Sequence, residues 1–455
     1  MAADDNASAS RYVCALLPVE SACRECLKET RMLELGVIAD DLTGGAKVAS
    51  LLESEGVPCP LVTSVDALDR LPADAEAVVV GRKILLLPPD EAAADARRSA
   101  EGLLAVGTRR LYYKYSAVFS STQEGNIGPV SEALMEVSGA DHLLFCPAFP
   151  SRDATVYQGR LFLGRNMLHE SAKSRDPVTP MTNSNLVEWL QAQSRKTVGL
   201  LPFRQVRASK AEREAYLREQ IDQGIRFFIT DALESTDLAR IAELAVGMPA
   251  VTGADELPVY LSRAWRTQER RCQPPRLLPP APGLEAVIAG SCSPKTNRQL
   301  ARFEREHPLF RIDLVEAARE ENLLDRIVDW ASTRLPQGPI GVSTTGDEDQ
   351  VRRVQQELGR DGASALADDL LASVAQRLHE LGVRKFVVAG GETSGAVVDR
   401  LGIDQVRVSG YDELYGGYCH WAVADPVSVV LKAGGAGEED FFEAALARMR
   451  LADTA

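Results

Sequence analysis

The sequence lacks most of the features that mark exported, membrane-spanning or disulfide-stabilised proteins. Only eight of its 455 residues are cysteine, and they do not form the paired framework of small secreted domains. No apolar run reaches the roughly 18 residues that a membrane helix needs, and residues 1–30 carry acidic side chains where a signal peptide has a basic start. We therefore expect a protein of the reducing cytoplasm with no membrane span.

Basic residues are in the minority, and histidine is scarce. The chain has 51 Lys and Arg against 65 Asp and Glu, a net charge of −14, and an acidic surface repels nucleic-acid phosphates and anionic lipids. We expect neither nucleic acid nor a membrane as a partner. The histidines are scattered, which indicates structural roles, and we assign no metal ligands; they are His142, His169, His307, His379 and His420.

The composition that is present is typical of a folded globular protein. Hydrophobic residues make up 45% and charged residues 25%, and at about 150 residues per domain the length predicts two or three domains. Residues 1–31 are polar and aperiodic, which predicts an extension that is disordered or that precedes a natural start at Met32. The Cys23 and Cys26 pair in this extension has no second ligand pair, so we expect no zinc or redox site there.

From Leu33 onward, short apolar strands alternate with amphipathic helices. This pattern predicts an α/β fold of two domains, each a mostly parallel sheet flanked by helices. A glycine-containing turn and a helix over 46–56 follow the first strand. The strands predicted in the first domain are 35–39, 75–81, 110–115, 142–149, 225–232 and 248–253.

A proline-rich segment divides the chain. Residues 270–283 contain five prolines, which cannot lie inside a central strand, so we predict a linker between a domain at 32–269 and a domain at 284–455. The strands predicted in the second domain are 285–290, 339–344, 384–391 and 427–435.

Glycine-rich loops follow strands of the second domain, and ligands bind at the carboxyl ends of strands in open α/β sheets. The loop at 390–395 has free backbone amides that suit a phosphate, and Thr393 or Ser394 could cap the helix predicted after it. Tight turning alone explains the glycines equally well. A second loop at 434–437 follows Lys432 and precedes a helix predicted to begin at Glu438.

A third strand end carries Ser291 and Ser293, followed by Pro294 at the first position of a helix. A capped helix is the simplest interpretation. None of these loops matches the P-loop or the dinucleotide fingerprint.

Charged side chains stand at strand ends of the first domain. Asp40 and Asp41 directly follow the first strand. Either could cap a helix, or one could accept a proton from a substrate hydroxyl or help to hold a metal, and we favour the functional interpretation. Lys114 ends a later strand, where it could meet an anionic group or be paired structurally.

Six blocks of the sequence, in chain order, resemble the four-carbon acid sugar kinase family. The resemblance runs from about Leu33 to the C-terminus. The residues at 125–130, 156–159 and 177–186 are similar to the corresponding motifs of the 3-oxo-tetronate kinase branch. The blocks are IADDLTGG, YYKY with FSSTQEGNIGPV, VYQGRLF, DPVTPMTNSNL, AGSCSPKTN and AGGETSG.

The resemblance implies an ATP- and Mg²⁺-dependent kinase that phosphorylates the terminal hydroxyl of a four-carbon acid sugar in a cleft between the two domains. Asp40 or Asp41 would deprotonate that hydroxyl. The implied substrate-side residues are Thr43, Lys47, Arg82, Lys114 and Asn126. The implied ATP-side residues are Ser291, Ser293, Gly390, Gly391, Glu392, Thr393, Lys432, Gly434 and Gly437. The protein could also form a homodimer.

Four positions depart from the family pattern. Lys47 replaces a carboxylate, Leu85 replaces a basic residue, Ser120 replaces an aspartate, and 433–436 replaces a Ser-Gly-Asn-Phe run. Three of the four lie in the acid-sugar domain, so altered substrate choice is favoured over lost ATP binding. Without a guanidinium at position 85, Lys47 or Arg82 would have to bind the substrate carboxylate.

Other functions remain as alternatives. The substrate could be a related acid such as 3-oxo-isoapionate, threonate or erythronate, and from another class the chain could be a non-catalytic sensor of a sugar acid or a nucleotide. A dehydrogenase is disfavoured because no GxGxxG motif is present.

Overall fold

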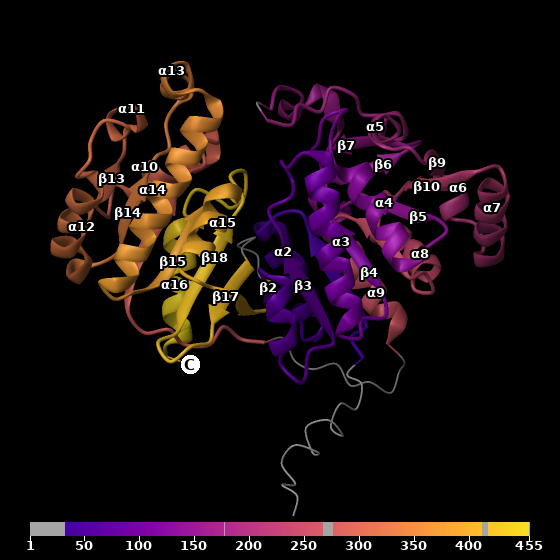
Figure 1. Cartoon of the computed structure of the whole chain (residues 1–455), viewed down its shortest axis with the longest axis horizontal. Coiled ribbons are helices and arrows are strands. Elements are labelled where there is room, and N and C mark those ends of the chain that lie inside the picture. The colour runs from indigo at the N-terminus through magenta and orange to yellow at the C-terminus, as the bar shows by residue number, and fades with distance from the viewer. Residues whose placement is uncertain (1–31, 177, 267–275, 412–416, 455) are drawn as a thin grey trace, which may run out of the picture.

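A computed structural model describes residues 32–176, 178–266, 276–411 and 417–454, which form two lobes in chain order (Figure 1). The extension at 1–31, with its cysteines, and residues 270–275 of the predicted linker lie outside the described residues. Within the described residues, no helix has the length and apolar character to cross a bilayer.

The first lobe is built on eight parallel strands, which confirms the predicted sheet type. Their spatial order differs from their chain order because helical crossovers return the chain between them. In spatial order they are β2 (Leu61–Val62), β3 (Ala77–Gly81), β1 (Leu35–Ala39), β4 (Leu111–Lys114), β11 (Ala250–Gly253), β5 (Leu143–Cys146), β10 (Ile225–Thr230) and β9 (Thr197–Leu201).

The second lobe has five parallel strands and two antiparallel ones. The parallel strands, in spatial order, are β13 (Leu309–Arg311), β14 (Ile340–Ser343), β12 (Leu284–Ala289), β15 (Val383–Ala389) and β18 (Val427–Lys432). The antiparallel strands β17 (Gly417–Trp421) and β16 (Gln405–Val408) follow, and β16 pairs with β2 of the first lobe. The two lobes therefore share one 15-stranded sheet, a join that the sequence analysis did not predict.

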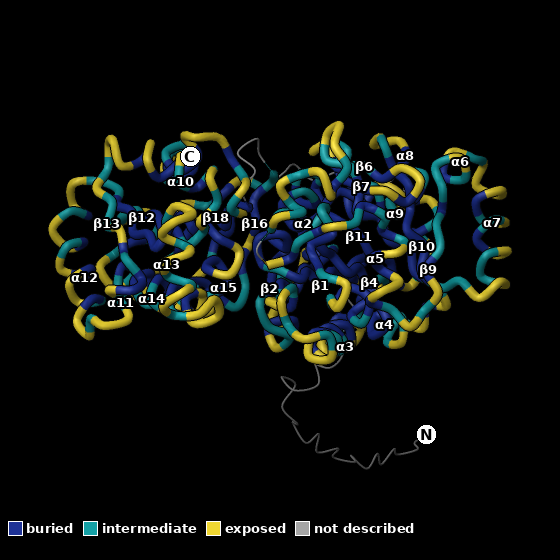
Figure 2. Tube along the Cα trace, turned by 90° about the horizontal axis from the view of Figure 1, so that it is seen from above, coloured by how far each residue is buried: buried dark blue, intermediate teal, exposed yellow. Residues whose placement is uncertain are grey.

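Helices cover both faces of this sheet, so the strands are buried in the middle and the exposed residues gather on the outer helices and loops (Figure 2). In the first lobe the helices are α2 (Leu42–Ser54), α3 (Pro89–Ala105), α4 (Ile127–Ser138), α5 (Leu186–Gln193), α6 (Phe203–Val206), α7 (Lys210–Asp222), α8 (Ser235–Ala245) and α9 (Leu257–Trp265). In the second they are α10 (Pro294–Phe303), α11 (Leu314–Ala317), α12 (Leu323–Arg334), α13 (Glu348–Leu358), α14 (Arg360–Glu380), α15 (Gly391–Arg400) and α16 (Phe441–Ala452).

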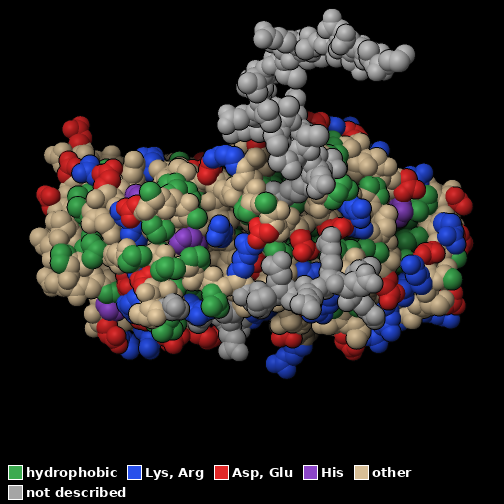
Figure 3. Space-filling view, turned by 90° about the horizontal axis from the view of Figure 1, so that it is seen from below, with side chains coloured by type: hydrophobic (Ala, Val, Ile, Leu, Met, Phe, Trp, Pro, Cys, Tyr) green, Lys and Arg blue, Asp and Glu red, His purple; other side chains and the backbone are tan. Residues whose placement is uncertain are grey.

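A small antiparallel sheet lies apart from the main one. It consists of β6 (Ala154–Tyr157), β7 (Arg160–Leu163) and β8 (Asn166–Met167). On the face shown in Figure 3, acidic and basic side chains are interspersed rather than gathered by sign.

Three predicted helix starts are wrong. Helix α2 begins at Leu42 instead of 46, because the Asp41 side chain accepts a hydrogen bond from the Gly44 amide at 2.5 Å and caps the helix earlier. Helix α15 begins at Gly391, so most of the predicted glycine turn is its first turn. Helix α16 begins at Phe441, and Glu438 lies in the preceding loop.

Candidate active site

Three neighbouring strands of the first lobe bring charged side chains to one point. Strand β4 lies between β1 and β11, and Lys114 is level with Ala39 on one side and Gly253 on the other. Asp40 and Asp255 come just beyond those two residues, so they flank the lysine. The carboxyl ends of parallel strands lie at the same edge of a sheet, and this register puts the three side chains together.

Lys114 is surrounded by carboxylates. Its Nζ lies 3.4 Å from Asp41 Oδ2, 3.5 Å from Asp40 Oδ1 and 3.9 Å from Asp255 Oδ1. Burial alone would lower the pKa of Lys114, but the three negative charges outweigh it and hold the pKa above its usual value. The lysine is therefore a buried, permanently charged ammonium group.

The two adjacent aspartates have different environments. Asp40 is buried, neither of its carboxylate oxygens has a hydrogen-bond partner among the described residues, and burial raises its pKa to about 7 against the pull of Lys114. Burial also acts on Asp41, but Lys114, the Gly44 amide and Lys47 outweigh it and lower its pKa. The Asp41 side chain is 27% exposed, so it is the carboxylate of the two that an incoming molecule can reach.

The other residues predicted on the substrate side divide into two groups. Thr43 and Lys47 lie on α2 beside the cluster: the Thr43 hydroxyl is buried without a partner among the described residues, and Lys47 Nζ lies 3.8 Å from Asp255 Oδ1. Arg82 and Asn126 are engaged elsewhere.

The structure does not bring Arg82 into the cluster. Its guanidinium donates two hydrogen bonds of 2.7 Å to Asp95 and one of 2.6 Å to the Thr63 carbonyl. The amide nitrogen of Asn126 donates to the carbonyls of Ile84, Leu85 and Leu87, which fixes the loop after β3. Both groups are therefore engaged within the first lobe, outside the charged cluster.

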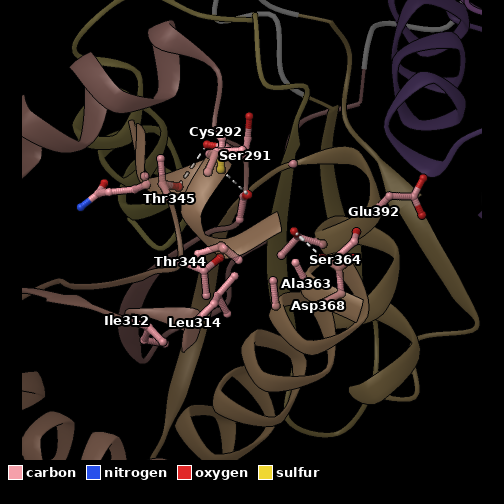
Figure 4. A pocket seen from close by; sticks show the side chains of 18 of the residues that line it. Ser291, Cys292, Ile312, Leu314, Thr344, Thr345, Ala363, Ser364, Asp368 and Glu392 are labelled. Atoms are coloured by element: carbon pink, nitrogen blue, oxygen red, sulfur yellow. Dashed lines mark hydrogen bonds between the residues drawn. The ribbon is translucent and has the colours of Figure 1, made fainter. Parts of the chain in front are cut away.

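In the second lobe, a pocket of about 510 Å³ opens in front of the glycine loops (Figure 4). Its lining combines the apolar side chains of Ile312, Leu314 and Ala363 with charged side chains such as Arg311 and Arg353, and it reaches Ser291, the loop at 390–393 and Gly434. A pocket that joins apolar side chains to glycine-loop amides has the chemistry of a nucleotide site, because the apolar part suits a base and the amides suit phosphates.

The glycine at position 390 has a conformation that other residues avoid. Its φ is +131°, and a side chain there would meet Thr393 Oγ1 at 3.0 Å and the Ser291 amide nitrogen at 3.3 Å. The Thr393 hydroxyl donates to Asp368 at 2.8 Å, so Thr393 does not cap α15; Gly390 holds that position. The loop therefore keeps its amides clear of side chains.

The remaining predicted ATP-side residues mostly hold the loops in shape. Ser293 caps α10 through the Thr296 amide, as the capped-helix interpretation predicted, and its hydroxyl donates to the Gly434 carbonyl at 2.6 Å. Lys432 is fully buried and donates to Thr296 Oγ1 and to the carbonyls of Ala433 and Gly434. Burial lowers the pKa of Lys432 to about 7. Gly437, with φ +78°, packs against Phe441.

Electrostatic and polar contacts link the two sites. The pKa of Glu392 is raised, first by partial removal from solvent and then by the charges of Asp368 and of Asp41 in the other lobe. Lys83, on the loop after β3, forms an ion pair of 2.5 Å with Asp399 of α15. The charged cluster and the glycine loop therefore lie close enough to influence each other.

Sequence reasoning missed several residues of both sites. Asp255 follows a predicted strand, and the rule that singled out Asp40 would have found it. Thr344 ends the predicted strand at 339–344, Thr345 follows it, and both line the pocket. Asp368 lies on α14, Leu314 begins α11, and Ile312 lies between β13 and α11; no local sequence signal marks any of these positions as a pocket wall.

Comparison with known proteins finds two family domains, one over each of the two lobes that carry these sites. Residues 35–257 match a family described as a sugar-binding N-terminal domain, and residues 286–442 match a nucleotide-binding C-terminal domain. A 3-oxo-tetronate kinase of Burkholderia multivorans is 38% identical over 90% of this chain and 96% of its own length. One of Cupriavidus necator is 37% identical over 91% and 97%.

Solved structures share the fold. A protein from Salmonella typhimurium LT2 superposes with a TM-score of 0.77 at 32% identity, covering 91% of this chain and 99% of its own. A Haemophilus influenzae protein gives a TM-score of 0.69 at 30% identity, with coverage of 91% and 100%.

Proposed function

The chain belongs to the four-carbon acid sugar kinase family, and we propose that it transfers the γ-phosphate of ATP to the terminal hydroxyl of a 3-oxo-tetronate. The observation that carries the proposal is the closeness of the two sites: α2, which Asp41 caps, packs against α15, which begins at the glycine loop, and the Lys83–Asp399 ion pair joins the same two lobes. An acid sugar at the charged cluster would face the end of a nucleotide whose phosphates lie on that loop.

Asp41 is the proposed proton acceptor. It is the more exposed of the two aspartates, and its lowered pKa keeps it ionised at neutral pH. Its Oδ1 caps α2 and its Oδ2 faces Lys114, so the carboxylate is held in one orientation. A fixed carboxylate within reach of a hydroxyl positions it for in-line attack and takes its proton.

Lys114 and Asp40 hold the Asp41 carboxylate in place. The Lys114 ammonium attracts the substrate carboxylate and fixes Asp41, while Asp40 supplies part of the countercharge that keeps the ammonium buried. On the other side, the backbone amides of 391–393, in the first turn of α15, stabilise the charge on the transferred phosphoryl group, while the Gly390 amide donates to the Lys432 carbonyl.

A divalent cation fits this site as a companion of the nucleotide. Mg²⁺ keeps several waters and binds phosphate oxygens with one or two carboxylates. The described residues contain no group of three acidic, histidine or cysteine ligands, but Asp368 and Glu392 both line the pocket beside the loop. We propose that these two would hold the cation, which would neutralise phosphate charge.

The test is ADP release by the purified protein with ATP and Mg²⁺ across tetronates, 3-oxo-tetronates and branched 3-oxo acids. We expect release that depends on a 3-oxo-tetronate. ADP release only with a branched acid such as 3-oxo-isoapionate would identify that acid as the substrate instead. ATP binding without ADP release for any of these acids would favour a non-catalytic sensor.

The role of Asp41 is tested in the same assay. Asp41→Asn should lower kcat by about 10²–10⁴ while ATP affinity stays as in the wild type. If kcat is undiminished, Asp41 is not the proton acceptor.

A further inference from the structure

Two lysines from different elements converge on a single carboxylate oxygen. Lys114 Nζ and Lys47 Nζ lie 3.9 Å and 3.8 Å from Asp255 Oδ1. The lysines come from β4 and α2 and the aspartate from the loop before α9, so three segments far apart in the sequence meet there. The Asp255 side chain is 4% exposed, which makes this a built feature of the interior and not a surface ion pair.

The two ammonium groups are attracted to Asp255 Oδ1 by charge but do not donate hydrogen bonds to it. Both N–O distances exceed hydrogen-bond length, and Asp255 Oδ1 has no hydrogen-bond partner among the described residues. The Lys47 side chain makes no hydrogen bond in the described part of the chain, and its ammonium lies 5.7 Å from the centre of the Phe149 ring. Lys114 donates one hydrogen bond, of 3.4 Å, to Asp41, so each ammonium group keeps donors that the described residues do not use.

We propose that Asp255 is a positioning residue that aims Lys47 and Lys114 together at the carboxylate of the acid sugar. This inference rests on the proposed function. With Arg82 engaged by Asp95, Lys47, whose side chain is 28% exposed, is the lysine of this cluster that an anionic group can contact, and the charge of the more deeply buried Lys114 adds to the attraction. A negative charge behind them keeps two ammonium groups close together in a buried site, which their mutual repulsion would otherwise oppose.

Glu256, the residue after Asp255, provides a matched control for the loss of a buried negative charge. Glu256 is also buried and acidic, but its carboxylate accepts long hydrogen bonds from the amide and hydroxyl of Ser151 and forms no ion pair with either lysine. Glu256→Gln removes the same charge from the same loop without touching the lysines.

The experiment compares wild type, Lys47→Met, Asp255→Asn, their double variant and Glu256→Gln. Asp255→Asn and Lys47→Met should each raise the KM for the acid sugar about tenfold, with the KM for ATP unchanged and kcat within about threefold. The double variant should be no worse than the worse single variant, because both remove the same arrangement. Glu256→Gln should match the wild type.

Three results would overturn the proposal: an unchanged sugar KM in Asp255→Asn, losses that multiply in the double variant, or an equal loss in Glu256→Gln. If the wild type turns over no acid sugar, the proposed function fails, and the pairing is judged by urea unfolding without substrate. Destabilisation of the double variant that is smaller than the sum of the singles supports the pairing, and an equal sum refutes it.

Discussion

The two lobes place their sites at the same kind of position, the carboxyl ends of parallel strands, but fill them with opposite chemistry. In the first lobe, Asp40, Asp41 and Asp255 surround the ammonium of Lys114. In the second lobe, glycines leave backbone amides open, and the buried Lys432 donates only to hydroxyl and carbonyl oxygens among the described residues.

This difference follows from what each site would have to bind. A small acid sugar offers hydroxyls and one carboxylate, which placed side-chain charges can distinguish. Phosphate groups carry negative charge over several oxygens, and a glycine loop at a helix N-terminus meets them with amides that need no side chain. The contrast between Lys114, an ion-paired lysine, and Lys432, a lysine held by neutral oxygens, can be tested directly.

The largest effect is expected from Lys114→Met. Removing one partner of a buried ion cluster leaves the others uncompensated, so the substitution should lower the free energy of unfolding by about 3–5 kcal/mol and abolish turnover. Urea unfolding near pH 8, where Asp40 is ionised, measures the loss. Stability within error of the wild type would show that the three carboxylates do not need this lysine.

Asp40→Asn should change how stability depends on pH. The pKa of Asp40 is about 7 in the folded protein, against an ordinary 3.8, so between these values the folded state holds a proton that the unfolded chain releases. Wild-type stability therefore falls as pH rises through this window and stays reduced above it. At about 1.4 kcal/mol per pKa unit, the variant should gain up to about 4 kcal/mol relative to wild type between pH 4 and pH 8.

The measurement is a series of urea unfolding curves for both proteins across that pH range. Glu53, whose pKa burial also raises to about 7, is present in both and cancels in the difference. Parallel pH curves would mean that Asp40 titrates normally.

Gly390→Ala should weaken the second lobe's site and spare the first. The positive φ and the contacts with Thr393 and Ser291 should cost about 1–3 kcal/mol of stability and lower ATP affinity, while acid-sugar affinity stays constant. Calorimetry with each ligand separates the two effects. Gly247→Ala, where an added Cβ meets nothing within 4 Å, serves as the control. An equal loss of stability and ATP affinity in this variant would mean that the effect of Gly390→Ala does not come from the glycine loop.

The smallest effect is expected from Lys432→Met. Because the pKa of this lysine is about 7, the substitution removes a weakly charged group. Each of the three oxygens that accept from it makes another hydrogen bond, so none is left unsatisfied, and stability at pH 8 should fall by only about 1 kcal/mol. Comparison with Lys114→Met in the same assay completes the contrast. Equal losses in both variants would mean that the two buried lysines are held in the same way.

Much of the fold could be read from local patterns. The strands predicted at 35–39 and 75–81 appear as β1 and β3, because a run of buried apolar residues between turn residues has few other structures available. Strand β2 has only two residues, too few for a periodic signal, so its pairing with β16, which joins the lobes, was not predictable.

The sequence by itself determined the chemical types at the strand ends: Asp40, Asp41 and Lys114 in one lobe, and glycine-rich loops in the other. Their positions follow from strand boundaries, and strand boundaries follow from local hydrophobicity. Only the tertiary structure decided how they are used. It brought Asp255 to Lys114 through the β4 and β11 pairing, committed Arg82 to Asp95, and turned Lys432 inward, because pairing between distant strands depends on the packing of the whole sheet and leaves no mark on nearby residues.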